Sequence, residues 1–162
     1  MNFAPELVPF WKNFTAACGP ASEGRLYEVF SFGDNQPTAD ALADLVLRDS
    51  KRATASLLRT DEADGKRPPQ AGDLSIVTSW SGRPLCVIET RSIEVVPFHR
   101  VTADFARAAG EGDGSLAYWR QGHLECFTRE CSGAGRQFAE DMLVVCERFD
   151  VLYREPAGHS SK

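Results

Sequence analysis

Residues 49–56 read Asp-Ser-Lys-Arg-Ala-Thr-Ala-Ser, and this stretch connects a predicted helix to a predicted strand. The helix has Thr38 as its expected cap and apolar residues at helical spacing, and the strand continues with alternating character to Leu58. Lys51 and Thr54 therefore lie three positions apart where the backbone changes direction. Functional groups are often found at such junctions, because a rigid scaffold holds them while they still reach solvent. A surface lysine beside a structural threonine is the alternative interpretation.

The rest of the chain has the patterns of short strands and amphipathic helices. Apolar residues at helical spacing predict helices, alternating residues predict strands, and runs rich in Asp, Gly and Pro predict loops. The predicted helices are 5–18, 38–49, 101–108 and 115–127, the predicted strands are 27–32, 51–58, 74–80, 85–96 and 142–153, and the predicted loops are 61–71 and 129–135.

The order of these elements predicts an α+β fold, because strands and helices do not alternate strictly. The strand 85–96 is long and rich in β-branched residues, which is typical of a bent barrel strand. We therefore expect a curled or closed β-barrel of about five or six strands with helices packed outside it. Residues 1–157 are expected to form one domain, with 1–25 as an N-terminal helical extension, and 158–162 a polar tail.

The composition narrows the class of protein. The chain has 162 residues and a net charge of −5, so it has no bulk attraction to polyanions, and we expect no duplex DNA partner. No apolar run approaches the ~20 residues that span a bilayer, and nothing marks a signal peptide. The five scattered cysteines favour reduced thiols in a cytoplasmic protein. His123, Cys126 and Cys131 lack a fourth ligand at zinc-like spacing, so we predict no metal site there.

A second stretch, Gly-Glu-Gly-Asp at 110–113, completes a set of motifs whose order and spacing resemble the ASCH domain, a PUA-like β-barrel family, and its branch of small stand-alone bacterial proteins. The resemblance extends over nearly the whole chain from about Phe30. The motifs that carry it are F-S-F-G-D (30–34), A-D-x-L-A-D-L-V-L (39–47), K-R-A-T-A-S-L-L (51–58), P-x-x-G-D-L-S-I-V (69–77), E-T-x-S-I-E-V-V-P-F (89–98), G-E-G-D-G-S-L-x-Y-W-R-x-x-H (110–123) and V-V-C-E-R-F-x-V-L-Y (144–153).

The resemblance implies a function associated with RNA or nucleosides. One small bacterial relative removes the acetyl group of N4-acetylcytidine with a lysine, a threonine and a glutamate, which fall here on Lys51, Thr54 and Glu111. The family motif has glycine where this chain has Asp49, and the acidic turn has Ala109 in place of a first glutamate. Because Asp is among the residues that tolerate a left-handed conformation, we expect the turn at Asp49 to be preserved.

Amide hydrolysis by these residues is chemically plausible. Thr54 would be the nucleophile, Lys51 the base that takes its proton, and Glu111 the acid for the leaving amine. Lys51 can act as a base only if burial or a cationic neighbour lowers its pKa, and we expect it at a solvent-lined pocket. A solvated carboxylate that caps the following helix is the alternative for Glu111. The expected substrate-binding residues are Arg52, Ser56, Arg59, Trp119 and His123, with the last two as a stacking surface and a polar contact to a base.

Three functions remain open on the sequence. The first is a hydrolase of an acylated nucleoside, which needs no cofactor. The second is a module that binds RNA or a modified base without chemistry. The third is a single-strand ribonuclease that depends on a divalent metal such as manganese. Each has a nucleoside or single-stranded RNA as partner and involves no membrane. The first predicts that Lys51, Thr54 and Glu111 face one cavity.

Overall fold

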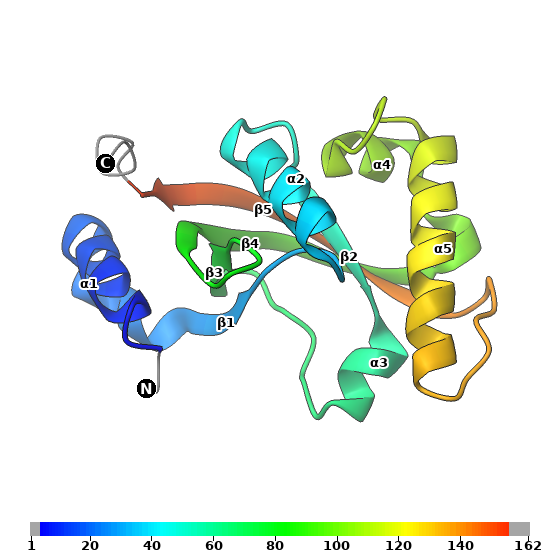
Figure 1. The fold of residues 1–162 in the computed structure, drawn as a ribbon, viewed down its shortest axis with the longest axis horizontal. Helices are drawn as coiled ribbons and strands as arrows, with labels where there is room; N and C mark the ends of the chain where they lie inside the picture. The colour runs from blue at the N-terminus through cyan, green and yellow to red at the C-terminus, as the bar shows by residue number, and fades with distance from the viewer. Residues whose placement is uncertain (1–3, 156–162) are drawn as a thin grey trace.

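The computed structural model describes residues 4–155 and contains one mixed sheet of five strands (Figure 1). The strands are β1 (Leu26–Phe30), β2 (Ala53–Leu57), β3 (Leu74–Thr78), β4 (Pro84–Pro97) and β5 (Leu143–Arg154). Their spatial order is β1-β3-β4-β5-β2, with β1 parallel to β3 and all other neighbours antiparallel. The predicted α+β class and the lower predicted strand number are confirmed.

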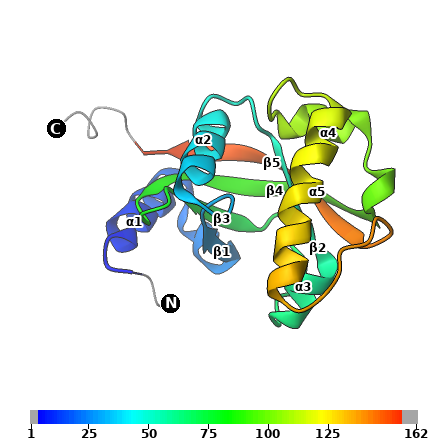
Figure 2. The same cartoon turned by 45° about the vertical axis from the view of Figure 1, so that its right-hand side comes forward.

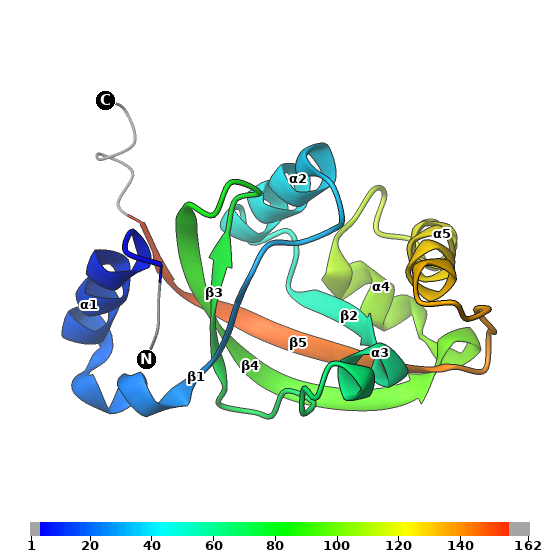
Figure 3. The same ribbon diagram turned by 60° about the horizontal axis from the view of Figure 1, so that its bottom comes forward.

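The two longest strands, β4 and β5, extend along the whole length of the sheet (Figure 3). Their register shifts twice, between Val87 and Ile88 and between Thr90 and Ser92. Shifts of this kind increase local twist and bend a strand, so the sheet curls as predicted.

The alternative of a closed barrel is wrong. In the described part of the chain, β1 pairs only with β3 and β2 only with β5, so the two edges do not meet. Both edge strands have only five residues, and a small cavity lies between them, lined by Glu28 and Phe30 of β1 and by Thr54 and Ser56 of β2. The open side of the sheet is thus also where candidate site residues lie.

Helices cover the sheet in three groups. Helix α1 (Leu7–Cys18) buries its predicted stripe of Leu7, Phe10, Trp11 and Phe14 at one end, where it packs with β3 and β4. Helix α2 (Gln36–Leu47) packs in the middle of one face. Helices α4 (Ala103–Ala109) and α5 (Leu116–Gly133) pack with β2 and β5 at the other end. Figure 2 shows α2 and α5 on the same side of the sheet.

Three local predictions need correction. Part of the predicted exposed loop 61–71 belongs to a short helix, α3 (Leu58–Ala63), in which Asp61 is buried and its carboxylate accepts a hydrogen bond from the Ser56 hydroxyl. The cap of α2 is Asn35, whose side chain accepts from the backbone of Thr38, whereas Thr38 lies inside the helix. Helix α5 continues through the predicted loop 129–135 as far as Gly133.

The short remaining elements are the 3-10 helices η1 (Pro20–Arg25) and η2 (Phe98–Arg100). Within residues 4–155 no helix has the length and apolar character needed to cross a membrane. The predicted polar tail, 158–162, lies outside the described residues.

Candidate functional site

The junction between α2 and β2 is a tight left-handed turn. Asp49 has a φ of 64°, and it is the only residue besides glycines with a positive φ in the described part of the chain. The backbone N–H groups of Ser50 and Lys51 donate to the carbonyl of Leu45, at 2.9 and 3.1 Å, and so close the end of the helix. The expected turn is therefore preserved with aspartate in place of glycine, and it directs Lys51 toward the interior.

Lys51 is a buried cation with a complete set of acceptors. Its side chain is 1% exposed, and Nζ donates to the carbonyls of Ala53 (2.8 Å) and Ala109 (3.4 Å) and to Oε2 of Glu111 (2.7 Å). The Nζ atom also lies 5.6 Å from the ring centre of Phe32. Because these contacts enclose the ammonium group, Lys51 is much less exposed than was expected for a residue at a solvent-lined pocket.

Burial controls the protonation of Lys51. Desolvation lowers the pKa of Lys51 below its usual value, while the charge of Glu111 and the hydrogen bond to it act in the opposite direction. A lysine of this kind gives up its proton more easily than an exposed one. This is the condition that a catalytic lysine base requires.

Gly110 brings Glu111 to Lys51. It ends α4 in a left-handed conformation with φ of 68°, and a Cβ placed there would lie 1.9 Å from the carbonyl oxygen of Ser50. The two chain segments are held together at this point by a hydrogen bond from the backbone N–H of Arg52 to the carbonyl of Ala108 (2.7 Å). Only glycine permits so close an approach of two backbones.

Lys51, Thr54 and Glu111 all line one cavity of about 820 Å³. Its lining comes from α2 and the loop before it, from β2, and from α5 and the turn before it. Besides those three residues, the lining consists of Phe32, Gly33, Asp34, Pro37, Thr38, Ala41, Leu42, Leu45, Ala55, Ser56, Gly112, Tyr118, Gly122, His123, Glu125, Cys126, Phe127, Arg129 and Glu130. The cavity therefore combines aromatic and aliphatic walls with a few convergent polar groups, which is the usual character of a small-molecule site.

The five residues expected to bind substrate are divided between the cavity and other places. Ser56 and His123 line it. Trp119 does not, since its side chain is 2% exposed and packs between Phe98, Phe105 and His123 in the core. A buried indole cannot offer a stacking surface to a base, so this expectation for Trp119 is corrected.

Two of the expected basic contacts also lie elsewhere. The guanidinium of Arg52 pairs with Asp150 of β5 at 2.7 Å, and Arg59 is exposed on α3. Neither of them lines the cavity. Arg129 is the arginine that does, and its Nε lies 3.2 Å from Oδ2 of Asp34 on the opposite wall. Arg129 was not predicted as a site residue, because the predicted helix ended at Phe127, before Arg129. The helical spacing of Phe127 and Cys131, both buried, was the signal for a longer helix.

His123 offers an acceptor rather than a charge. Its Nδ1 lies 3.0 Å from the carbonyl oxygen of Trp119, and because a carbonyl only accepts, Nδ1 must carry the proton. Burial lowers the pKa of His123, which favours the neutral ring. In this tautomer Nε2 has a free lone pair, so His123 can accept a hydrogen bond from an N–H or O–H group.

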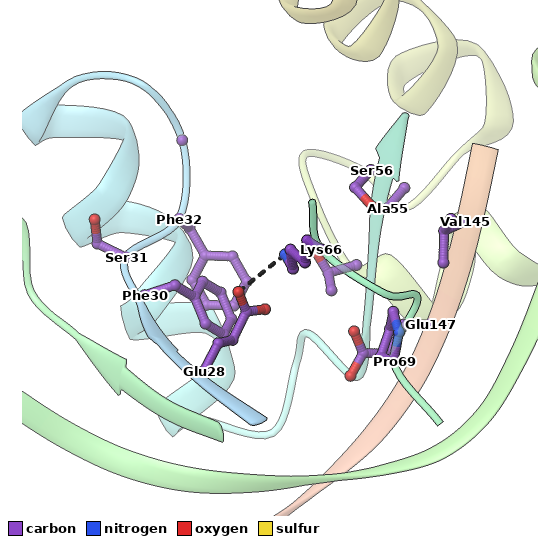
Figure 4. A pocket seen from close by; sticks show the side chains of 12 residues that line it. Glu28, Phe30, Ser31, Phe32, Ala55, Ser56, Lys66, Pro69, Val145 and Glu147 are labelled. Atoms are coloured by element: carbon purple, nitrogen blue, oxygen red, sulfur yellow. Dashed lines mark ion pairs between the residues drawn. The ribbon is translucent and has the colours of Figure 1, made fainter. Parts of the chain in front are cut away.

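A smaller cavity of about 220 Å³ adjoins the first. The two cavities share the lining residues Phe32, Gly33, Thr54, Ala55 and Ser56. Since the last three belong to β2, this strand lines both cavities. Figure 4 shows the ion pair of 2.9 Å between Glu28 and Lys66 in the lining of the smaller cavity, which Glu147 of β5 also lines.

No group of three or more His, Cys, Asp or Glu side chains within residues 4–155 could hold a metal ion.

The comparisons agree with the resemblance seen in the sequence. The family model of the ASCH domain matches residues 28–153. A crystal structure of an ASCH domain from Lactobacillus crispatus is 35% identical, with a TM-score of 0.88, over 95% of this chain and 98% of that one. The structure of a protein from Enterococcus faecalis is 30% identical, with a TM-score of 0.81, over 92% of this chain and 89% of that one. A hypothetical protein of 14% identity and TM-score 0.50, over 78% of this chain and 99% of that one, shares the fold alone. No curated protein matches this chain.

Proposed function

The chain belongs to the ASCH domain family, and on that premise we propose that it is a small hydrolase of an N-acylated nucleoside such as N4-acetylcytidine. One observation carries the proposal: the buried ammonium of Lys51 lies 2.7 Å from the carboxylate of Glu111 in the lining of a cavity that also includes Thr54. These are the three groups that cleavage of an amide requires, a hydroxyl nucleophile, a base and an acid.

The Lys51–Glu111 pair can supply both the base and the acid. Transfer of one proton from Nζ to the carboxylate leaves a neutral amine and a carboxylic acid, with the number of protons unchanged. The amine then takes the proton of Thr54 as its oxygen attacks the acyl carbon, and the acid gives its proton to the leaving nitrogen as the C–N bond breaks. The products of this step are an acyl ester on Thr54 and the free amino-nucleoside, with the ion pair restored.

Water completes the reaction. It adds to the acyl ester as its proton passes to the Glu111 carboxylate, and the C–O bond to Thr54 breaks as the Thr54 oxygen takes a proton from the Lys51 ammonium. The carboxylic acid leaves, and Glu111 returns its proton to the Lys51 amine, which restores the ion pair. The neutral acceptor on His123 and the aromatic walls of the larger cavity could orient the substrate during both steps.

A binding module without chemistry is the second candidate. The observation in its favour is that Nζ of Lys51 already has three acceptors, at 2.7, 2.8 and 3.4 Å, so the ammonium is satisfied without a ligand. In that case Lys51 would only hold the turn at Glu111 in place. Because Lys51 is 1% exposed, it would not contact a phosphate, and Arg129 would be the cavity's cation. A ribonuclease dependent on manganese has no comparable observation in its support.

The role of Thr54 separates the two candidates. Thr54→Val keeps the shape of the side chain but removes the hydroxyl, and we expect the rate of N4-acetylcytidine hydrolysis to fall at least about a hundredfold. Thr54→Ser keeps the hydroxyl and is expected to stay within roughly tenfold of the unmodified protein. The measurement is kcat/KM from the release of cytidine. Equal rates in Thr54→Val and the unmodified protein would contradict the role of Thr54 as the nucleophile.

A further inference from the structure

Glu147 is an unusual residue for its place in the sheet. Its strand neighbours on the same face, Val145 and Phe149, are buried. Glu147 nevertheless carries a carboxyl group there, and it lines the smaller cavity. An acid at a core-facing position of a strand needs an explanation, because burying a carboxylate costs free energy unless it is paired.

The position of Glu147 relative to Thr54 supplies one. The two residues are directly opposite in the antiparallel pair of β2 and β5. Side chains at such positions have Cβ atoms about 5 Å apart. Thr54 lines both cavities and Glu147 the smaller one, so a group held beside the Thr54 hydroxyl also lies beside the Glu147 carboxyl.

The smaller cavity suits a planar ring. Its volume of about 220 Å³ corresponds to roughly seven water molecules at liquid density. Two aromatic side chains, Phe30 and Phe32, line it with their rings 5.0 Å apart. Aromatic faces are stacking platforms for heterocyclic bases.

We propose that Glu147 is a specificity-determining residue, whose carboxyl group pairs with the edge of an N-acylated amino-heterocycle at two adjacent atoms, the ring nitrogen and the exocyclic N–H. This inference rests on the proposed function and deepens it by naming the part of the substrate that is recognised. A neutral carboxyl group fits this edge, because its O–H donates to the ring nitrogen while its other oxygen accepts from the N–H. Acylated amines without an adjacent ring nitrogen lack one half of the pair.

The surroundings of Glu147 favour the neutral form. Burial raises the pKa of Glu147 to about 7, and the charges of Glu28 and Asp73 add to this, while Lys66 and a hydrogen bond from Thr90 oppose it. Lys66 lowers the pKa of Glu147 only a little, because its positive charge is already paired with Glu28 at 2.9 Å.

The hydrogen bond from Thr90 also distinguishes the two carboxyl oxygens of Glu147 as donor and acceptor. The Thr90 hydroxyl donates to Oε2 of Glu147 at 2.6 Å, so that oxygen acts as an acceptor. The proton of the neutral acid then belongs on Oε1, which is free to donate to a ring nitrogen, while the second lone pair of Oε2 can accept the exocyclic N–H.

The test is calorimetric binding of cytidine, which has the same ring nitrogen and N–H, at pH 6 and pH 8. If only the neutral acid binds, its fraction falls from about nine-tenths to about one-tenth, and affinity weakens roughly tenfold between these pH values. In Glu147→Gln the amide also has one donor and one acceptor, so we expect tight binding at both pH values. In Glu147→Leu we expect binding at least roughly tenfold weaker at pH 6.

Two controls sharpen the result. In 3-deazacytidine a C–H replaces the ring nitrogen, and it should bind roughly tenfold more weakly than cytidine to the unmodified protein at pH 6, but equally to Glu147→Leu. Glu94→Gln removes an exposed carboxylate from the neighbouring strand β4 and should leave the pH dependence unchanged.

The proposal is overturned if Glu147→Leu binds cytidine as tightly as the unmodified protein, if cytidine binds equally at pH 6 and pH 8, or if it does not bind at all. Hydrolysis of N4-acetylcytidine together with any of these results would leave the hydrolase standing without Glu147. The expected binding pattern without hydrolysis would support Glu147 and contradict the hydrolase.

Discussion

Lys51→Met is expected to lower kcat/KM for N4-acetylcytidine at least about a thousandfold, because the base and the proton shared with Glu111 are both lost. Methionine approximately fills the space of the lysine stem, so a loss of packing contributes little. Lys51→Arg is expected to be nearly as damaging, because a guanidinium stays protonated at neutral pH. The measurement is the rate of cytidine release by each variant at equal concentration of folded protein.

A loss of stability in Lys51→Met has to be separated from the loss of chemistry. The variant leaves the carboxylate of Glu111, only 17% exposed, without its cation, and breaking a buried pair commonly costs about 3–5 kcal/mol. The double variant Lys51→Met/Glu111→Gln removes that charge and should regain part of the lost stability. We expect it to remain inactive. Activity regained together with stability would mean that the pair is only structural.

Gly110→Ala is expected to lower the free energy of unfolding by about 2–5 kcal/mol, from about 1–3 kcal/mol for the clash and about 1–2 kcal/mol for the left-handed backbone. The added methyl would lie 1.9 Å from the carbonyl oxygen of Ser50 and 3.2 Å from Cα of Lys51, so backbone must move. In a chain of this size we expect the midpoint of thermal unfolding to fall by roughly 4–20 °C. Because the clash forces the Glu111 turn away from Lys51, hydrolysis should fall as well.

Gly114 provides a matched control. It also has a left-handed conformation, with φ of 78°, but a Cβ there would meet no atom within 4 Å. Gly114→Ala should therefore show only the cost of the backbone conformation, about 1–2 kcal/mol. If both variants unfold at the same temperature, the close approach at Gly110 does not hold the site together.

Local patterns were enough to predict most elements of the fold. The stripe of Leu7, Phe10, Trp11 and Phe14 predicted α1, and the hairpin strands were predicted to within a few residues. The left-handed turn at Asp49 was also predicted, but from the resemblance, because the family motif has glycine there and Asp tolerates the same conformation. Features of this kind depend on neighbours in the sequence and need no knowledge of distant contacts.

The features that were missed depend on contacts between distant segments. The burial of Lys51 depends on Ala109 and Glu111, about sixty positions away. Whether the sheet closes is decided by the pairing of its two edge strands, β1 and β2, which no local sequence pattern specifies. Glu147 could have been found, since an acid between buried Val145 and Phe149 breaks the alternation of its strand.

The central proposal is that the cavity containing Lys51, Thr54 and Glu111 cleaves an acyl group from a nucleoside. The most direct test is to incubate the unmodified protein with N4-acetylcytidine and to quantify cytidine and acetate over time, with Lys51→Met as the blank. We predict that both products appear in equal amounts, at a rate that saturates with substrate and exceeds the blank at least about a thousandfold. A rate in the unmodified protein no higher than in Lys51→Met would contradict the account.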